Sequence, residues 1–112
     1  MINWILCNSL QSLQEVISKS YKRRVFIFKH SSRCSISSIA KLRLEDHWDS
    51  TLSENSEIYF LDVISHREIS QEVASYFQVH HESPQILIIE NGECIHDASH
   101  FDITVEEIRE VI

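Results

Sequence analysis

The chain has 112 residues, the length of one domain, and its 43% of hydrophobic residues can fill an ordinary packed core. A single Gly and a single Pro argue against disorder, and no apolar run approaches the about 20 residues that span a bilayer. The formal net charge of −7 argues against non-specific binding to nucleic acid. We therefore expect a single domain over residues 1–112, with neither nucleic acid nor a membrane as partner.

The first part of the chain alternates helical and strand patterns. Residues 3–6, NWIL, are a candidate short strand. Apolar side chains recur at helical spacing between residues 10 and 20, after a capping residue at Asn8 or Ser9. Residues 25–28, VFIF, form a continuous apolar run, which is typical of a strand buried on both faces of a parallel sheet.

A second helix is predicted to begin near Cys34. Its apolar face is expected to contain Ile36, Ile39, Ala40, Leu44 and Trp48. Residues 49–57, DSTLSENSE, have the composition of a polar loop. Residues 58–63, IYFLDV, predict a second buried strand.

The next helix carries a capping pattern at its start. Ser65 and Glu68 have the spacing of a capping box, and Ile64 and Ile69 have that of the accompanying hydrophobic staple. The helical pattern then continues through Val73, Tyr76 and Phe77.

The end of the chain predicts a hairpin and a short helix. Residues 86–89 form a strand, Asn91–Gly92 is a strong two-residue turn, and residues 93–97 return antiparallel. Thr104 with Glu107 repeats the capping box, and the staple is repeated by Ile103 and Ile108.

This order predicts an α/β fold with right-handed parallel crossovers and an antiparallel edge. The expected sheet is mixed, has four or five strands and is covered by helices on both faces. That is the order of the thioredoxin fold, so a cysteine after the first central strand and a proline before a later strand become informative markers.

Cys34 lies where thioredoxin-like proteins carry a reactive cysteine, between a central strand and the following helix. A thiolate at a helix N-terminus is stabilised by free backbone N–H groups and by the helix dipole. Lys29, His30 and Arg33 flank the cysteine and favour the same charge state. The alternative is a thiol that serves only as a small buried hydrophobic group.

Position 37, where a dithiol enzyme carries its second cysteine, is Ser37. The chain therefore cannot close a C-x-x-C disulfide, and a monothiol exchange through Cys34 is the predicted chemistry. The Ser37 hydroxyl either donates a hydrogen bond to the Cys34 sulfur or is only an early-helix side chain.

Pro84 is the single proline and precedes the predicted strand at 86–89. The fold assignment predicts a cis Ser83–Pro84 bond that faces the active cysteine, with the backbone of Ser83 open to an extended thiol-containing ligand.

Basic residues cluster around the cysteine. No Asp or Glu occurs between Val16 and Leu44. The stretch holds Lys19, Lys22, Arg23, Arg24, Lys29, Arg33, Lys41 and Arg43. These charges form either a solvated face or a local positive field that would attract a small anionic thiol.

The remaining cysteines lie far from Cys34 in the sequence. Three scattered cysteines favour free thiols in a reducing compartment, and the N-terminus lacks the features of a signal peptide. Cys7 is expected to pack near the first strand or helix, and Cys94 to share one strand face with His96. A metal site at Cys94, His96 and His100 lacks a second ligand pair. Either Cys7 or Cys94 could act as a remote resolving thiol.

Three stretches together resemble the YtxJ-type monothiol bacilliredoxins. They are VFIFKHSSRCSISSIA at 25–40, YFLDV at 59–63 and ESPQILIIENGECIHDASH at 82–100. The resemblance implies that Cys34 is the reactive cysteine and Pro84 the cis proline. The chain departs from the family pattern at Arg33, where Thr is frequent, and at Ser35, which replaces the proline after the cysteine.

The resemblance implies that the protein removes bacillithiol from protein mixed disulfides in the bacterial cytoplasm. Bacillithiolated client proteins and bacillithiol, an anionic thiol acting as co-substrate, would then be its partners, with no bound cofactor and no metal. The candidate substrate-binding residues are Lys29, His30, Arg33, Ser37, Ser83 and Pro84. Among them, Lys29 and Arg33 are the candidate contacts for the carboxylates of the thiol. Two other classes stay open: a glutaredoxin-like protein that carries an iron–sulfur cluster, and a non-catalytic interaction module with the thioredoxin fold.

Overall fold

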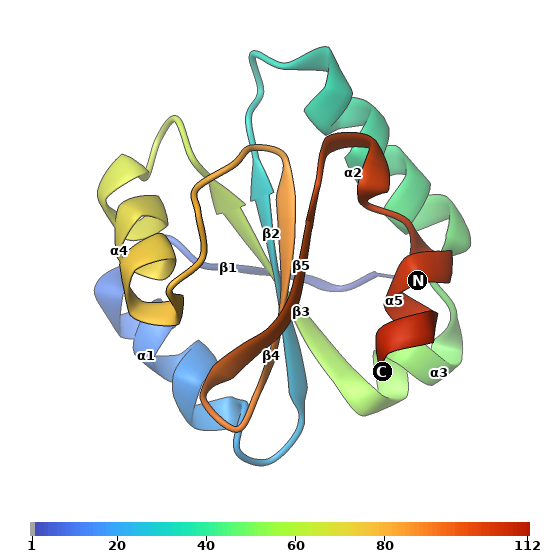
Figure 1. Cartoon of the computed structure of the whole chain (residues 1–112), viewed down its shortest axis with the longest axis horizontal. Helices are drawn as coiled ribbons and strands as arrows, with labels where there is room; N and C mark the ends of the chain where they lie inside the picture. The colour runs from blue at the N-terminus through green and yellow to red at the C-terminus, as the bar shows by residue number, and fades with distance from the viewer. Residues whose placement is uncertain (1) are drawn as a thin grey trace.

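A five-stranded mixed sheet forms the centre of the protein in the computed structural model, which describes residues 2–112 (Figure 1). Its strand order is β1-β3-β2-β4-β5. The strands are β1 (Trp4–Leu6), β2 (Arg24–His30), β3 (Ser56–Asp62), β4 (Gln85–Glu90) and β5 (Glu93–Ser99). β1, β3 and β2 are parallel to one another, whereas β4 and β5 are antiparallel additions. The predicted α/β sheet and the candidate strand at residues 3–6 are both confirmed.

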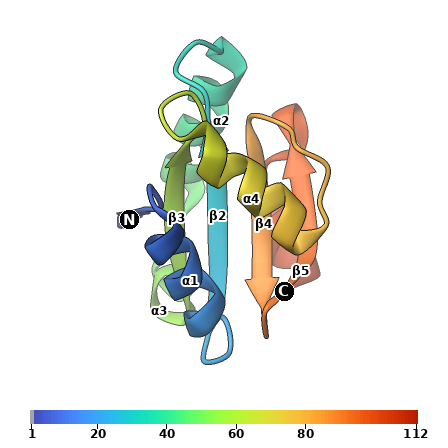
Figure 2. The same ribbon diagram turned by 90° about the vertical axis from the view of Figure 1, so that its left-hand side faces the viewer.

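Helices cover both faces of this sheet. Figures 1 and 2 show α1 (Leu10–Lys19) and α4 (Arg67–Phe77) on one face. The other face is covered by α2 (Ser35–His47), α3 (Ser50–Asn55) and α5 (Val105–Val111), with the short 3-10 helix η1 (His100–Asp102) before α5. Within residues 2–112 no helix is both long and apolar enough to span a bilayer.

The central strand β2 supplies side chains to both cores because alternate residues of a strand point to opposite faces. Phe26 and Phe28 belong to the cluster beneath α2 and α5. Val25 and Ile27 belong to the cluster beneath α1 and α4. The next residue on this second face is Lys29, which is 0% exposed. The alternation thus determines which site residues share a face.

The start of α1 agrees with the sequence. Ser9 is the N-cap, and its hydroxyl accepts the backbone N–H of Ser12 while the Ser12 hydroxyl accepts the N–H of Ser9. This reciprocal pair satisfies two donors that the first turn of a helix leaves free.

Residues 49–57 are not the predicted polar loop. Asp49 caps α3 by accepting the N–H of Leu52 at 3.0 Å and also forms an ion pair with Arg109 of α5. Leu52 is buried in the core beneath α2. A single apolar side chain is too weak a periodic signal to predict this one-and-a-half-turn helix, although its cap is visible in the sequence.

The predicted capping box at Ser65 is wrong. The N-cap of α4 is His66, which makes no side-chain capping bond. Asp62 accepts the N–H groups of Ile64 and Ser65 at 3.0 and 3.2 Å, so its carboxylate organises this turn. The helix therefore begins one residue later than its capping pattern indicates.

The hairpin turn is confirmed, but β5 is longer than predicted and irregular. Asn91 and Gly92 have φ values of 52° and 78°, as a two-residue turn of this type requires. The register then shifts between Ile88 and Ile89, so that Ile88 pairs with His96 and Ile89 with Cys94. The resulting bulge places Cys94 and His96 on opposite faces, which corrects the expectation that they share one.

The last helix is capped as predicted, with one difference. The Thr104 hydroxyl accepts the N–H of Glu107 at 3.1 Å, and Ile103 and Ile108 are buried. The Glu107 carboxylate, however, lies 3.0 Å from Nε2 of His96 instead of returning to the backbone of the cap.

Candidate functional site

Cys34 is the N-cap residue of α2, directly beyond the loop that follows β2. Its carbonyl accepts the N–H groups of Ser37 and Ser38 at 3.1 and 3.3 Å, and its own N–H donates to the carbonyl of Ser31. No side chain caps this helix, and the thiol is partly exposed. The helix therefore begins at the predicted position, with its N-terminal N–H groups next to an accessible sulfur.

The helix buries part of the apolar face that the sequence predicted, because Ala40, Leu44 and Trp48 lie in the core. Its buried residues are Ser37, Ala40 and Leu44, whereas Ile39 is 42% exposed. The buried face is rotated toward Ser37, so the residue in the position of a second active-site thiol points into the protein.

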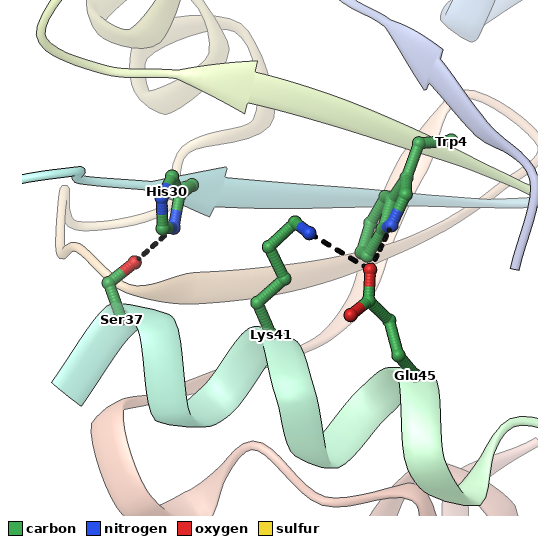
Figure 3. A network of polar contacts seen from close by, with 5 residues as sticks. All are labelled: Trp4, His30, Ser37, Lys41 and Glu45. Carbon is green, nitrogen blue, oxygen red and sulfur yellow. Dashed lines mark hydrogen bonds and ion pairs between the residues drawn. The ribbon is translucent and has the colours of Figure 1, made fainter. Parts of the chain in front are cut away.

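Ser37 is 0% exposed and links α2 to the end of β2. Its hydroxyl accepts the backbone N–H of Ser31 at 3.0 Å and lies 2.7 Å from Nδ1 of His30 (Figure 3). No hydrogen bond joins the Ser37 hydroxyl to the Cys34 sulfur among the described residues. The sequence left open whether Ser37 bonds the Cys34 sulfur or is only an early-helix side chain. The structure shows a structural role, because Ser37 holds the loop that carries Cys34.

His30 lies between this serine and the aromatic core. Its ring is 5.3 Å from that of Phe60, centroid to centroid. Burial lowers the pKa of His30, Asp62 opposes this shift, and the Lys41 ammonium adds to it. A neutral imidazole can accept the Ser37 proton at Nδ1, which is the arrangement that this lowered pKa favours.

Farther along α2, a second polar link joins the helix to β1. The Glu45 carboxylate accepts from Lys41 Nζ at 2.9 Å and from Trp4 Nε1 at 2.8 Å (Figure 3). The Lys41 ammonium also lies over the Trp4 ring, 5.6 Å from its centroid. Both links fix α2 against the sheet and thereby fix the position of its N-terminus.

Lys29 lies on the other face of the sheet from Ser37 and His30. Its ammonium is completely buried, 3.1 Å from the Ser70 carbonyl and 3.1 Å from Nδ1 of His81. Burial lowers its pKa to about 8. The expectation that Lys29 contacts a ligand at the thiol is corrected by this geometry: a strand residue next to His30 must point to the opposite face.

The basic stretch of the sequence does not form one field around Cys34. The residues from Lys19 to Arg24 precede or begin β2, while Cys34 follows its end, and seven strand residues span about 20 Å. Lys19 pairs with Glu57, Arg24 with Glu90 and Lys41 with Glu45. Arg33 remains in the loop beside Cys34, exposed and without an ion pair among residues 2–112.

The Ser83–Pro84 peptide bond is cis, as the fold assignment predicted. The Pro84 carbonyl accepts the N–H of His100 at 3.1 Å, which attaches the start of η1 to this loop. The Ser83 hydroxyl is buried without a hydrogen-bond partner among the described residues. The proposed pairing of the Ser83 backbone with a ligand stays a prediction.

The match to known proteins agrees with this geometry. Residues 6–108 match the family described as monothiol bacilliredoxin BrxC. The chain belongs to the BrxC family. A solved structure described as a candidate oxidoreductase with a thioredoxin fold is 30% identical, with a TM-score of 0.82 over 96% of this chain and 92% of that one. This family membership and this neighbour support a thiol redox role.

Two thioredoxins share the fold of this BrxC-family chain at low identity. The Malassezia sympodialis thioredoxin Mala s 13 is 17% identical, with a TM-score of 0.78 over 98% of this chain and 88% of that one. The Fasciola hepatica thioredoxin is also 17% identical, with a TM-score of 0.70 over 94% and 92% of the two chains. At such identity the likeness concerns the fold alone.

The other two cysteines of this BrxC-family chain are on the face covered by α1 and α4. Cys7 is 0% exposed in that core, which confirms its predicted packing near the first strand or helix. Cys94 packs against the same cluster. Burial is the main cause that raises the pKa of each thiol to about 11. No disulfide joins either of them to Cys34 among the described residues, and Cys34 caps a helix on the other face.

No metal cluster emerges from the candidate ligands. The bulge in β5 separates Cys94 from His96, and His96 is engaged with Glu107. Over residues 2–112 no group of three or more His, Cys, Asp or Glu side chains is arranged to hold a metal ion.

Sequence reasoning did not find two features of this BrxC-family site. One is the bond between His30 and Ser37, which joins two residues predicted separately as ligand contacts. The other is the contact between Nδ1 of His81, an exposed residue, and the buried Lys29 ammonium. Strand alternation along β2 is a signal for both, because it assigns His30 and Lys29 to different faces before any contact is known.

Proposed function

We propose that this protein is a monothiol oxidoreductase that removes bacillithiol from protein mixed disulfides through Cys34. The observation that carries the proposal is the partly exposed thiol at the start of the 13-residue helix α2, with a buried, hydrogen-bonded serine at position 37. Such a site can accept one thiol but cannot close an internal disulfide with the fourth residue of the motif.

The exchange has two steps. The Cys34 thiolate attacks the bacillithiol sulfur of the client's mixed disulfide, the S–S bond breaks, and the client cysteine leaves as a thiolate that takes a proton from solvent. Cys34 now carries bacillithiol. A second bacillithiol thiolate attacks that bacillithiol sulfur, which releases the Cys34 thiolate and yields bacillithiol disulfide. The client sulfur is thereby reduced and the second bacillithiol sulfur oxidised, while the number of disulfide bonds stays the same.

Fewer cations lie near Cys34 to attract an anionic thiol than the acid-free stretch of the sequence suggested. Arg33 is the exposed cation nearest to Cys34 in the chain, and Lys41 and Arg43 follow on α2. Lys41 is already paired with Glu45, and the Arg43 guanidinium lies over the Phe101 ring at 5.9 Å. We therefore assign the attraction of the small-thiol carboxylates to Arg33.

The deciding experiment follows the mass of the protein after mixing with a bacillithiolated client. The wild type should gain one bacillithiol on Cys34 while the client loses one. Cys34→Ser should show neither change, and Cys94→Ser should behave as wild type. Transfer that persists in Cys34→Ser would disprove the proposal.

The same assay separates bacillithiol from other small thiols and from the remaining alternatives. A glutathionylated client should transfer more slowly than the bacillithiolated one if bacillithiol is the partner. Visible absorbance after anaerobic purification would favour an iron–sulfur carrier instead. A Cys34 thiol that exchanges no faster than free cysteine would favour a non-catalytic module.

A further inference from the structure

The face of the sheet opposite Ser37 contains a buried positive charge without a carboxylate partner. Lys29 is 0% exposed, and its Nζ contacts the Ser70 carbonyl and Nδ1 of His81, each at 3.1 Å. The ion pairs of residues 2–112 do not include it. A buried ammonium is costly unless an opposite charge lies near it, so this position is electrostatically incomplete.

His81 connects the buried Lys29 ammonium to the protein surface through its imidazole ring. An ammonium group has donors only, so Nδ1 of His81 must accept from it, and the ring proton is then on Nε2. Burial, followed by the Lys29 charge, lowers the pKa of His81, which keeps the ring neutral near pH 7. The ring thus presents an N–H donor on the side away from Lys29.

A cleft of about 310 Å³ opens above these groups. Its lining residues are Val63, Ile64, Arg67, Ser70, Gln71 and His81. Ser70 and His81 are the two hydrogen-bond partners of Lys29, so the ammonium lies directly behind this wall. Arg67 is exposed and makes no ion pair among the described residues.

The chemistry of the cleft is unusual for this protein. The chain has 17 acidic residues against 10 basic ones, yet none of the lining residues is acidic. Glu82, next to His81, is turned toward His80, 3.6 Å from its Nε2. Amide, guanidinium and imidazole donors therefore face the cleft, with a buried cation behind them.

The cleft and Cys34 lie at the same end of the sheet. Val63 follows β3 directly, and its N–H donates to the carbonyl of His30, the last residue of β2, at 2.9 Å. The β2–α2 loop that carries Cys34 begins at the next residue. Ligands of parallel sheets bind outside the carboxyl ends of the strands, where this cleft opens.

We propose that this cleft is a binding site for a small carboxylate or phosphate anion. Arg67 and the Nε2–H of His81 are the direct contacts, and Lys29 is the buried counter-charge. The anion has two sources, either the acid groups of the small thiol that Cys34 exchanges or a separate small anion. Only the first source rests on the proposed function.

The test uses Cys34→Ser protein labelled with nitrogen-15, so that no thiol exchange contributes. L-malate, inorganic phosphate and S-methyl bacillithiol are titrated separately, and NMR follows the Ser70 and Gln71 amides and the His81 ring. We expect saturable shifts at these positions. Adding Lys29→Met or Arg67→Gln should weaken binding about tenfold, the loss typical for one charged hydrogen bond or ion contact.

Lys22→Gln is the matched control, since it removes one exposed positive charge at the opposite end of β2. It should leave the affinity unchanged. Cleft shifts with S-methyl bacillithiol identify the small thiol as the source. Cleft shifts with malate or phosphate, but none with S-methyl bacillithiol, identify a separate anion. No saturable shift with any probe overturns the site, as does an unchanged affinity in Arg67→Gln, whose exposed side chain is not needed for folding.

Discussion

The hydroxyl oxygen of Ser37 lies 2.7 Å from Nδ1 of His30 and so joins the first turn of α2 to the last residue of β2 (Figure 3). The same oxygen accepts the N–H of Ser31. Between these residues the chain makes the turn that carries Cys34. The position that would hold a second thiol in a dithiol enzyme here contributes to the rigidity of a one-cysteine site.

Replacing Ser37 with alanine should loosen this turn. The substitution leaves Nδ1 of His30 and the N–H of Ser31 without their partner, and an unsatisfied buried polar group costs about 1–3 kcal/mol. We expect the free energy of unfolding to fall by that amount in urea titrations and the Ser31 amide to exchange faster with solvent. Ser38→Ala, at the next and exposed position, should change neither. Equal stability of both variants would contradict the structural role of Ser37.

The three cysteines should differ sharply in reactivity. Cys34 is partly exposed at a helix N-terminus, whereas the pKa of Cys7 and that of Cys94 are raised to about 11. Because the thiolate is the reactive species, one equivalent of iodoacetamide at pH 7 should modify Cys34 first. Peptide mapping by mass spectrometry measures the order. Modification of Cys94 as fast as Cys34 would show that Cys94 is more accessible than the bulged strand allows.

Local patterns predicted most of the fold because they depend on neighbours in the sequence. The caps at Ser9 and Thr104 and the Asn91–Gly92 turn need only residues within a few positions. The capping box at Ser65 failed because a stronger acceptor, the Asp62 carboxylate, lies three residues earlier. Competition between two plausible local arrangements is decided by tertiary geometry, which the pattern does not contain.

The site was predicted less completely, since proximity in sequence was taken as proximity in space. Lys29 and His30 are adjacent but point to opposite faces of β2. The cations from Lys19 to Arg24 share an acid-free stretch with Cys34 but lie at the other end of the strand. Cys94 and His96 have the spacing of one strand face, and a bulge separates them. These outcomes depend on strand direction and register, which composition does not report.

Arg33 should affect exchange with an anionic small thiol more than the other exposed cations. Arg33→Gln should lower the rate with bacillithiolated client about threefold and reduce the dependence of the rate on salt, since long-range attraction is screened. Lys22→Gln makes the same charge change at the far end of β2 and should retain the wild-type rate and salt dependence. Stopped-flow rates between low and high salt provide the comparison. Equal losses in the two variants would mean that only net charge matters.

The buried ammonium of Lys29 should make stability depend on pH in a defined window. Burial lowers its pKa to about 8 from the ordinary 10.5, so between these values the unfolded chain binds more protons than the folded one. Stability therefore rises with pH across this window, and the penalty for burying the charge is fully present below pH 8. Lys29→Met lacks the group, and replacing a buried charge by an apolar side chain of similar size is often neutral or stabilising.

The difference in unfolding free energy, wild type minus Lys29→Met, should increase by about 2–3 kcal/mol from pH 7.5 to pH 10.5. Taking this difference cancels the other groups that titrate there, Cys7 and Tyr59 among them, because both proteins contain them. Urea titrations at four or five pH values measure it, and Lys22→Gln, which removes an exposed lysine, should show no such trend. A flat difference for Lys29→Met would mean that the ammonium is as well solvated in the folded protein as in the unfolded chain.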